Sequence, residues 1–183
     1  MNRPNKLSGF VDADWAGCPD SRRPSSGYAL MLNRATVWWK SKRQAVGALS
    51  TAEAEFVTAS SLVQEVIYAR RLLEQLGFPQ QEPTPVMRGP VYEDNTRCIK
   101  RSEGSVGGSD RAKHIDLREH FIHEAVDKNI LEHESINSTD NAAADLLTKP
   151  LLKALFWPLC KCLLGYAIIC TDMQQFERYM QDT

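Results

Sequence analysis

Four acidic side chains stand out by their places in the expected elements: Asp12 within the first strand, Glu55 on the sheet-facing side of the first long helix, Asp94 at the end of the fourth strand and Asp145 on the last helix. Asp12 interrupts the strand-like run GFVDADWAG, although aspartate is depleted in strands and a buried carboxylate is costly unless paired or metal-bound. Carboxylates brought together repel one another, by about 4 kcal/mol per pair at ~4 Å and an effective dielectric constant of roughly 20. A divalent cation between the carboxylates makes their close approach favourable, and hard oxygen ligands select Mg²⁺ or Mn²⁺. Two such ions about 4 Å apart form the clamp that nucleases use to activate water and stabilise the leaving oxygen.

The first of these residues belongs to an expected antiparallel meander. Runs rich in apolar and aromatic residues predict three strands, at residues 8–15, 27–32 and 35–42. The polar turn at residues 20–26 and the tight turn at Asn33-Arg34 are short, so successive strands run antiparallel. Asp14 is the alternative to Asp12 as the chemical residue of the first strand, but it more simply begins the turn, aided by Trp15.

A long helix follows and carries Glu55. Ser50 is a good N-cap, Glu53 completes a capping box, and Gly77 ends the helix. Apolar residues recur at a spacing of three and four, at Ala59, Leu62, Val63, Val66, Ala69 and Leu73. At about 100° per residue Glu55 falls within that apolar stripe, whereas Glu53 falls on the opposite face, where capping explains it.

The second half of the chain alternates strands and helices. Residues 78–90 are rich in Pro and Gln and are expected to form a loop. A strand is expected at 91–94, ending in Asp94, followed by a short helix at 96–103 and a Gly/Ser loop at 103–110. A helix is expected at 113–128, with its inward residues at Ile115, Leu117, Phe121, Ile122 and Val126. A strand at 130–136 and a helix at 142–148, which carries Asp145 and is closed by Pro150, complete the expected elements. This order predicts an α/β fold: a mixed five-stranded sheet whose meander is joined to parallel strands, with helices on both faces. The first and fourth strands, running in parallel, would bring Asp12 and Asp94 side by side.

Length and composition limit the remaining possibilities. The 183 residues suit one domain with an appendage, expected as an N-terminal extension at 1–8, a domain at 9–150 and a C-terminal tail at 151–183 that can pack as a helix. A formal net charge of −1 excludes a polybasic binder but leaves room for a basic patch in the first 50 residues. Five irregularly spaced cysteines indicate reduced thiols in an intracellular protein. No signal peptide is evident, and charged residues and Pro158 make 151–170 a poor membrane span.

Five segments, taken in order, resemble the ribonuclease H domain of copia-type LTR-retrotransposon Pol polyproteins. They are GFVDADWAGCPDSRRPSSGYALML, VWWKSKRQAVGALSTAEAEFVTAS, VYEDNTRCI, KHIDLREHFIHE and AAADLLTKPL, and they cover about residues 9 to 165. The resemblance implies a ribonuclease H-like fold and an endonuclease that hydrolyses the RNA strand of RNA–DNA hybrids during reverse transcription. It implies Asp12, Glu55, Asp94 and Asp145 as catalytic residues and ligands of two Mg²⁺ ions, for which Mn²⁺ can substitute. It also implies a reverse transcriptase domain upstream, no membrane partner, and a place in cytoplasmic virus-like particles or the nucleus.

Contacts with nucleic acid are expected from residues near the third strand and the long helix. Lys40, Lys42 and Arg43 can neutralise phosphates. Strand alternation would turn one of the two neighbouring tryptophans, Trp38 and Trp39, inward and leave the other to stack on sugar or base, unless both serve packing. Ser50 and Thr51 begin a helix, where a phosphate is favoured, and Asn95 could bond a 2′-hydroxyl group.

Two further interpretations stay open. Residues 166–183 do not match the family and no upstream enzyme precedes residue 1, so the chain could be a catalytically silent relic that only binds nucleic acid or a partner. Asp145 could be an ordinary surface residue of its helix. An integrase-like nuclease of the same fold is disfavoured, because such sites take their glutamate from a late helix and Glu55 lies on the first long one.

Overall fold

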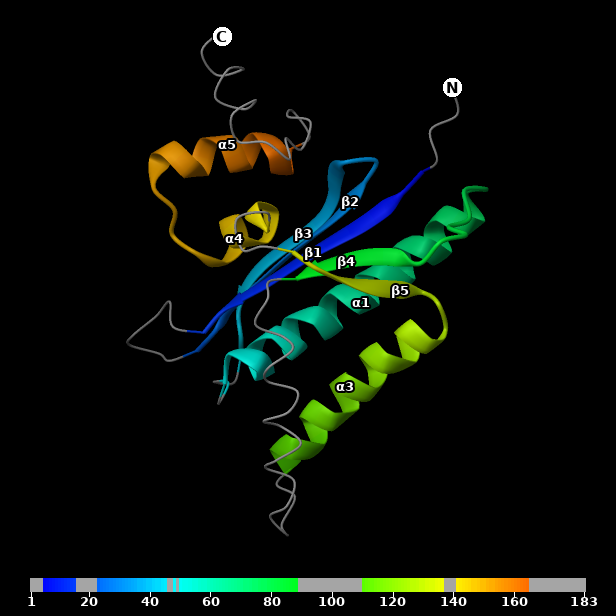
Figure 1. Cartoon of the computed structure of the whole chain (residues 1–183), viewed down its shortest axis with the longest axis horizontal. Helices are drawn as coiled ribbons and strands as arrows, with labels where there is room; N and C mark the ends of the chain where they lie inside the picture. Colours follow the sequence, from blue (N-terminus) through cyan, green and yellow to red (C-terminus); the bar gives the residue numbers. More distant parts are fainter. Residues whose placement is uncertain are drawn as a thin grey trace, which may run out of the picture.

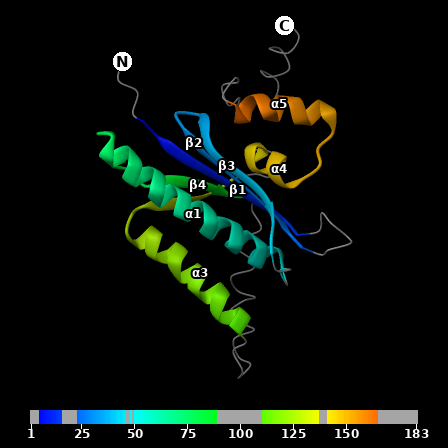
Figure 2. The same cartoon turned by 180° about the vertical axis from the view of Figure 1, so that it is seen from behind.

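A computed structural model describes residues 5–15, 23–45, 48, 50–88, 110–136 and 141–164. Within these residues five strands form one sheet in the order β3-β2-β1-β4-β5. The strands are β1 (Leu7–Asp14), β2 (Ser25–Leu32), β3 (Ala35–Arg43), β4 (Thr84–Arg88) and β5 (Leu131–Ser135); the helices are α1 (Thr51–Gln75), α3 (Asp110–Asp127), α4 (Ala142–Thr148) and α5 (Lys153–Leu163). Helices α1 and α3 cover one face of the sheet, and α4 and α5 lie over the other (Figures 1 and 2). The predicted mixed α/β sheet is therefore confirmed.

The predicted meander is confirmed as well. Strand β1 pairs antiparallel with β2, and β2 with β3, which leaves β3 at the edge of the sheet. The turn between β2 and β3 consists of Asn33 and Arg34, both with positive φ (53° and 70°). Two successive left-handed residues are typical of the tight hairpin turn whose twist matches that of the strands.

Helix α1 begins and ends where its capping signals indicate. The Ser50 side chain accepts a hydrogen bond from the Glu53 backbone N–H at 3.2 Å, which satisfies one of the free donors at the helix start. At the other end Gly77 has a φ of +85°, a conformation that glycine adopts without strain, and the Phe78 N–H bonds back to the Leu73 carbonyl at 2.8 Å.

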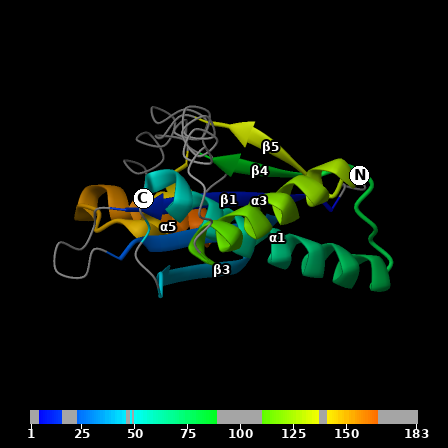
Figure 3. The same cartoon turned by 90° about the horizontal axis from the view of Figure 1, so that it is seen from below.

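Strand β4 corrects the prediction that residues 78–90 form a loop. It covers Thr84–Arg88 and pairs in parallel with both β1 and β5; Figure 3 shows these strands from the side of α1 and α3. Pro85 made this run look like a loop, since proline cannot donate to a ladder. The pairing with β1 begins only at Val86, after the proline, so Pro85 has a neighbouring strand on the β5 side alone. The expected strand at 91–94 lies outside the described residues.

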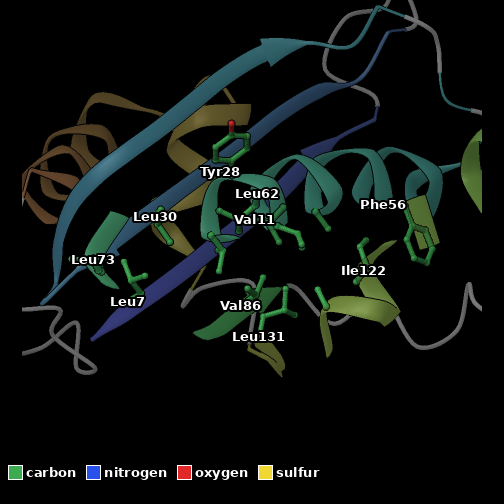
Figure 4. Packing of buried hydrophobic residues seen from close by; sticks show 14 residues of the cluster. Leu7, Val11, Tyr28, Leu30, Phe56, Leu62, Leu73, Val86, Ile122 and Leu131 are labelled. Carbon is green, nitrogen blue, oxygen red and sulfur yellow. The ribbon is translucent and has the colours of Figure 1, made fainter. Parts of the chain in front are cut away.

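Two hydrophobic clusters lie on opposite faces of the sheet and fix the direction of each side chain of β1. One joins Val11, Tyr28 and Leu30 to α1, α3 and the inner strands (Figure 4). The other joins Phe10, Ala29 and Met31 to α4 and to Leu163 of α5. Because alternate residues of a strand share a face, Asp12 lies on the same face as Phe10, beneath α4.

Helix α3 departs from its predicted inward face at one position. Ile122 is buried and Phe121 and Val126 pack against the main cluster, but Leu117 is exposed. None of the described helices combines the length and hydrophobicity needed to cross a membrane.

Candidate active site

Asp12 meets helix α4 because a glycine on the neighbouring strand lets that helix approach the sheet. Asp12 pairs with Gly27 of β2. A Cβ atom at Gly27 would lie 2.6 Å from Thr148 Cγ2 and 2.8 Å from Leu147 Cβ, so α4 packs directly on this backbone. The approach lets the Thr148 hydroxyl donate a 2.5 Å hydrogen bond to Asp12 Oδ2. The carboxylate that interrupts the first strand is thereby held in one orientation.

Two further hydrogen bonds fix α4 along its length. At its start the buried Asn141 side chain donates to the Val11 carbonyl of β1 at 2.9 Å. At its end the Ser41 hydroxyl of β3 donates to the Leu147 carbonyl at 2.6 Å. A helix of seven residues is too short to be stable alone, so these contacts and the cluster beneath it determine where Asp145 lies.

Lys149, immediately after α4, joins the two acidic residues. Its Nζ lies 2.6 Å from Asp145 Oδ1 and 3.4 Å from Asp12 Oδ2. The two carboxylates are largely buried, with exposed side-chain fractions of 16% for Asp12 and 22% for Asp145, whereas Lys149 is 41% exposed. The structure therefore brings Asp12 and Asp145 together around one cation, and Asp145 is not an ordinary surface residue.

The electrostatics of the pair reflect both burial and mutual repulsion. Burial raises the pKa of Asp145, and the neighbouring Asp12 charge raises it further, while the hydrogen bond from Lys149 opposes both. Burial lowers the pKa of Lys149, but its hydrogen bond to Asp145 and the charges of both carboxylates outweigh burial and raise it. Both pKa values are therefore raised, as expected where two neighbouring carboxylates share a single cation.

Of the other two predicted acidic residues, only Glu55 lies in the described part of the chain. Glu55 lies in the first turns of α1 with its side chain half-buried. Asp94 and Asn95 lie outside the described residues. Within the described part of the chain no three His, Cys, Asp or Glu side chains lie close enough together to hold a metal ion. The donor set at Asp12 and Asp145 nevertheless fits a hard divalent cation, because two oxygen anions from separate elements already share one positive charge.

A groove on the opposite face of the same end of the sheet gathers positive charge. It has a volume of about 630 Å³ and is lined by β2 and β3, by the first turns of α1 and by the first half of α3. Its cationic side chains are Lys40, Lys42, Arg43 and Arg118. The Lys40 ammonium lies 5.8 Å from the centre of the Tyr28 ring, and the Arg118 guanidinium donates to the Ser60 hydroxyl at 2.7 Å.

The predicted substrate residues at β3 are thus brought together, and their tryptophans correct the expected packing. Both Trp38 (44% exposed) and Trp39 (62% exposed) lie at the surface, because β3 is an edge strand. They do point to opposite faces, as alternation requires, and Trp38 contacts Tyr68 of α1 edge-to-face at 6.0 Å. The Ser50 hydroxyl serves the helix cap, so a phosphate contact at Ser50 stays a prediction.

Three polar residues of these sites were missed from the sequence: Thr148, Lys149 and Arg118. Lys149 follows Asp145 by four residues, a spacing that predicts their ion pair, but nothing in the sequence indicates the contact with Asp12. Arg118 lies on α3 and reaches the groove only through the packing of α3 on α1.

A solved structure, described as LC11-RNase H1 in complex with an RNA/DNA hybrid, superposes with a TM-score of 0.51 over 78% of this chain and 94% of that one, at 15% identity. The chain therefore has a ribonuclease H-like fold, which confirms the predicted fold class.

Its sequence relatives then identify the family. The chain is 40% identical over 159 residues to the retrovirus-related Pol polyprotein from transposon TNT 1-94 of Nicotiana tabacum, covering 87% of this chain and 11% of the relative. It is 35% identical over 158 residues to that from transposon RE2 of Arabidopsis thaliana, covering 85% and 10%. No family model matches the chain. The chain is thus homologous to one segment, about a tenth of the length, of the retrovirus-related Pol polyproteins of plant transposons.

Proposed function

We propose that the chain is a divalent-metal-dependent ribonuclease H segment that hydrolyses the RNA strand of RNA–DNA hybrids, within a retrotransposon polyprotein that also supplies a reverse transcriptase. The observation that carries the proposal is the meeting of Asp12 and Asp145, from β1 and α4, around one cation in a ribonuclease H-like fold. The homology to Pol polyproteins supports the polyprotein context.

Each side chain of the site has a distinct part in this proposal. Asp12 and Asp145 would hold Mg²⁺ or Mn²⁺, joined by Glu55 and Asp94. The Thr148 hydroxyl keeps one Asp12 oxygen oriented and leaves the other available. When bound, the metal would polarise the scissile phosphate and lower the pKa of the attacking water. Burial of the two carboxylates excludes bulk water, which strengthens their attraction for a cation.

The basic groove supports recognition of a nucleic acid backbone. Lys42, Arg43 and Arg118 converge there from β3 and α3, and phosphate contacts of this kind supply most sequence-independent affinity. The groove and the acidic pair lie on opposite faces of one end of the sheet, since Ser41 contacts α4 whereas Lys40 and Lys42 on either side of it line the groove. A duplex crossing that end would contact the groove with one part of its backbone while presenting another to the acidic pair.

Cleavage of a labelled RNA strand in an RNA–DNA hybrid tests the proposal. The folded chain should produce fragments with Mg²⁺ or Mn²⁺ and none with a chelator. Asp12→Asn and Asp145→Asn should each lower the rate about 100-fold or more, because each removes a charge that holds the metal. Asp127→Asn is the matched control, since Asp127 is an exposed aspartate at the end of α3.

Two results would count against the proposal, the first against the activity and the second against the assigned site. Hybrid binding without metal-dependent cleavage by the folded wild-type chain would favour the silent binder instead. Undiminished cleavage by Asp145→Asn would remove α4 from the site.

A further inference from the structure

Lys149 differs from an ordinary surface lysine in the number and origin of its acidic partners. Its ammonium contacts Asp145 at 2.6 Å within the same helical turn and Asp12 at 3.4 Å on β1. The matched comparison is Lys128, immediately after α3, whose ammonium lies 2.5 Å from Glu124 at the same spacing of four residues. That pair is exposed and local, with 48% of the Glu124 side chain accessible, whereas the partners of Lys149 are mostly buried.

We propose that Lys149 is an internal counter-ion that occupies the cation position between Asp12 and Asp145 in the metal-free protein and withdraws when a divalent cation binds. The inference rests on the proposed function, because it assumes that these two carboxylates are metal ligands. Without a cation the two buried charges would face each other, and the lysine relieves that repulsion. It keeps the ligand oxygens together and oriented before any metal arrives.

The geometry requires Lys149 to move. A bound Mg²⁺ lies about 2.1 Å from its carboxylate oxygens, so an ammonium within hydrogen-bond distance of the same two side chains would face a dication at very short range. The lysine side chain can leave, since it is 41% exposed and carries its charge on a flexible four-carbon stem that reaches solvent readily. The divalent ion prevails because it brings twice the charge to the same oxygens.

Metal affinity measured without turnover tests the proposal. Binding of Mn²⁺ to the full chain is followed from the electron paramagnetic resonance signal of the free ion, for wild type, Lys149→Met and the control Lys128→Met. Removing the competing ammonium should tighten binding roughly threefold to thirtyfold, whereas Lys128→Met should stay within about twofold of wild type. A second measurement is made on the wild-type chain, and Lys149→Arg serves only to assign the signal: Mg²⁺ titration of wild type carrying ¹³C-labelled lysines should shift the Lys149 signal and leave Lys128 unchanged.

The outcomes separate this inference from the proposed function. Wild type that binds Mn²⁺, with Lys149→Met binding no more tightly, overturns the counter-ion and leaves the metal site intact. A Lys149 signal that stays unchanged at saturating Mg²⁺ also overturns it, whatever the affinities. Absence of binding by both wild type and Lys149→Met removes the metal site and the counter-ion together. Binding by Lys149→Met alone would overturn the proposed withdrawal, because the lysine would then keep the wild-type site closed to metal.

Discussion

Replacing Gly27 with alanine should displace α4 and disable the acidic site without touching a carboxylate. The added methyl group would lie 2.6 Å from Thr148 Cγ2, 2.8 Å from Leu147 Cβ and 3.1 Å from the Ala144 carbonyl oxygen. Ordinary carbon contacts are about 3.5–4.0 Å, so the surroundings must move by roughly 1 Å. Leu147 Cβ and the Ala144 oxygen are attached to the helix backbone, so relief requires a shift of the helix and not of one side chain.

Gly27→Ala should lower both the free energy of unfolding and the rate of cleavage. Overpacking of this kind costs about 1–3 kcal/mol, and Gly27→Ala should lie near the upper value because no flexible side chain can yield. A shift of about 1 Å in catalytic groups can lower a rate about 100-fold. Gly9→Ala is the matched control on β1: its nearest contact is Leu62 Cδ2 at 2.9 Å, the far end of a flexible side chain. It should cost about 1 kcal/mol and leave the site unchanged.

Urea unfolding in metal-free buffer measures the free energy of unfolding. Mn²⁺ affinity and the rate of hybrid cleavage report whether the acidic site is intact. Gly27 has no such role if Gly27→Ala binds metal and cleaves as wild type does while remaining folded. Equal loss of metal affinity in Gly9→Ala and Gly27→Ala would also exclude that role, because the damage would then come from general destabilisation.

Substitutions of Tyr28 and Arg118 test two further features, a buried hydrogen bond and the basic groove. Burial, the hydrogen bond to Glu65 and the charge of Glu65 all raise the pKa of Tyr28, so the stability that its neutral phenol contributes is complete below about pH 10 and is lost as the pH rises further. Tyr28→Phe should therefore be about 1 kcal/mol less stable at neutral pH and lose less stability above pH 10, as urea unfolding at several pH values would reveal. Arg118→Met should weaken hybrid binding uniformly across sequences and lower the slope of log affinity against log salt by about one phosphate contact; an unchanged slope would remove Arg118 from the interface.

The elements that could be predicted from sequence are those whose signals are local. The Ser50 cap and Gly77 define α1, and the pair Asn33-Arg34 defines the hairpin turn, because each acts on the backbone within a few residues. Strand β4 was missed for the converse reason: Pro85 is a local loop signal, and only the stagger of its two neighbouring strands makes a proline tolerable there. The exposure of Trp38 likewise follows from β3 lying at the sheet edge, a property of the whole topology.

The candidate site likewise contains residues that could be predicted from the sequence and residues that could not. Asp12 was recognisable because a carboxylate contradicts the strand around it, whereas Asp145 was assigned through the resemblance to the family. The structure brings the two together. Thr148 and Lys149 gave no such signal, since a threonine and a lysine at a helix end are ordinary residues. Their parts depend on β1, which lies far away in sequence and contacts α4 only after the sheet has formed.

The construction of this site makes the short helix α4 its most sensitive component. Seven residues cannot form a stable helix alone, so Asn141, Ser41 and the bare backbone of Gly27 must hold α4 against the sheet. The two acidic residues oppose that docking, because bringing them together costs free energy unless a cation lies between them. Docking of α4 and cation binding are therefore linked: whatever neutralises Asp12 and Asp145, the Lys149 ammonium or a metal ion, also stabilises the helix position. The position of α4, and with it that of Asp145, is therefore sensitive to metal. The sheet beneath α4, which packs on α1, is not.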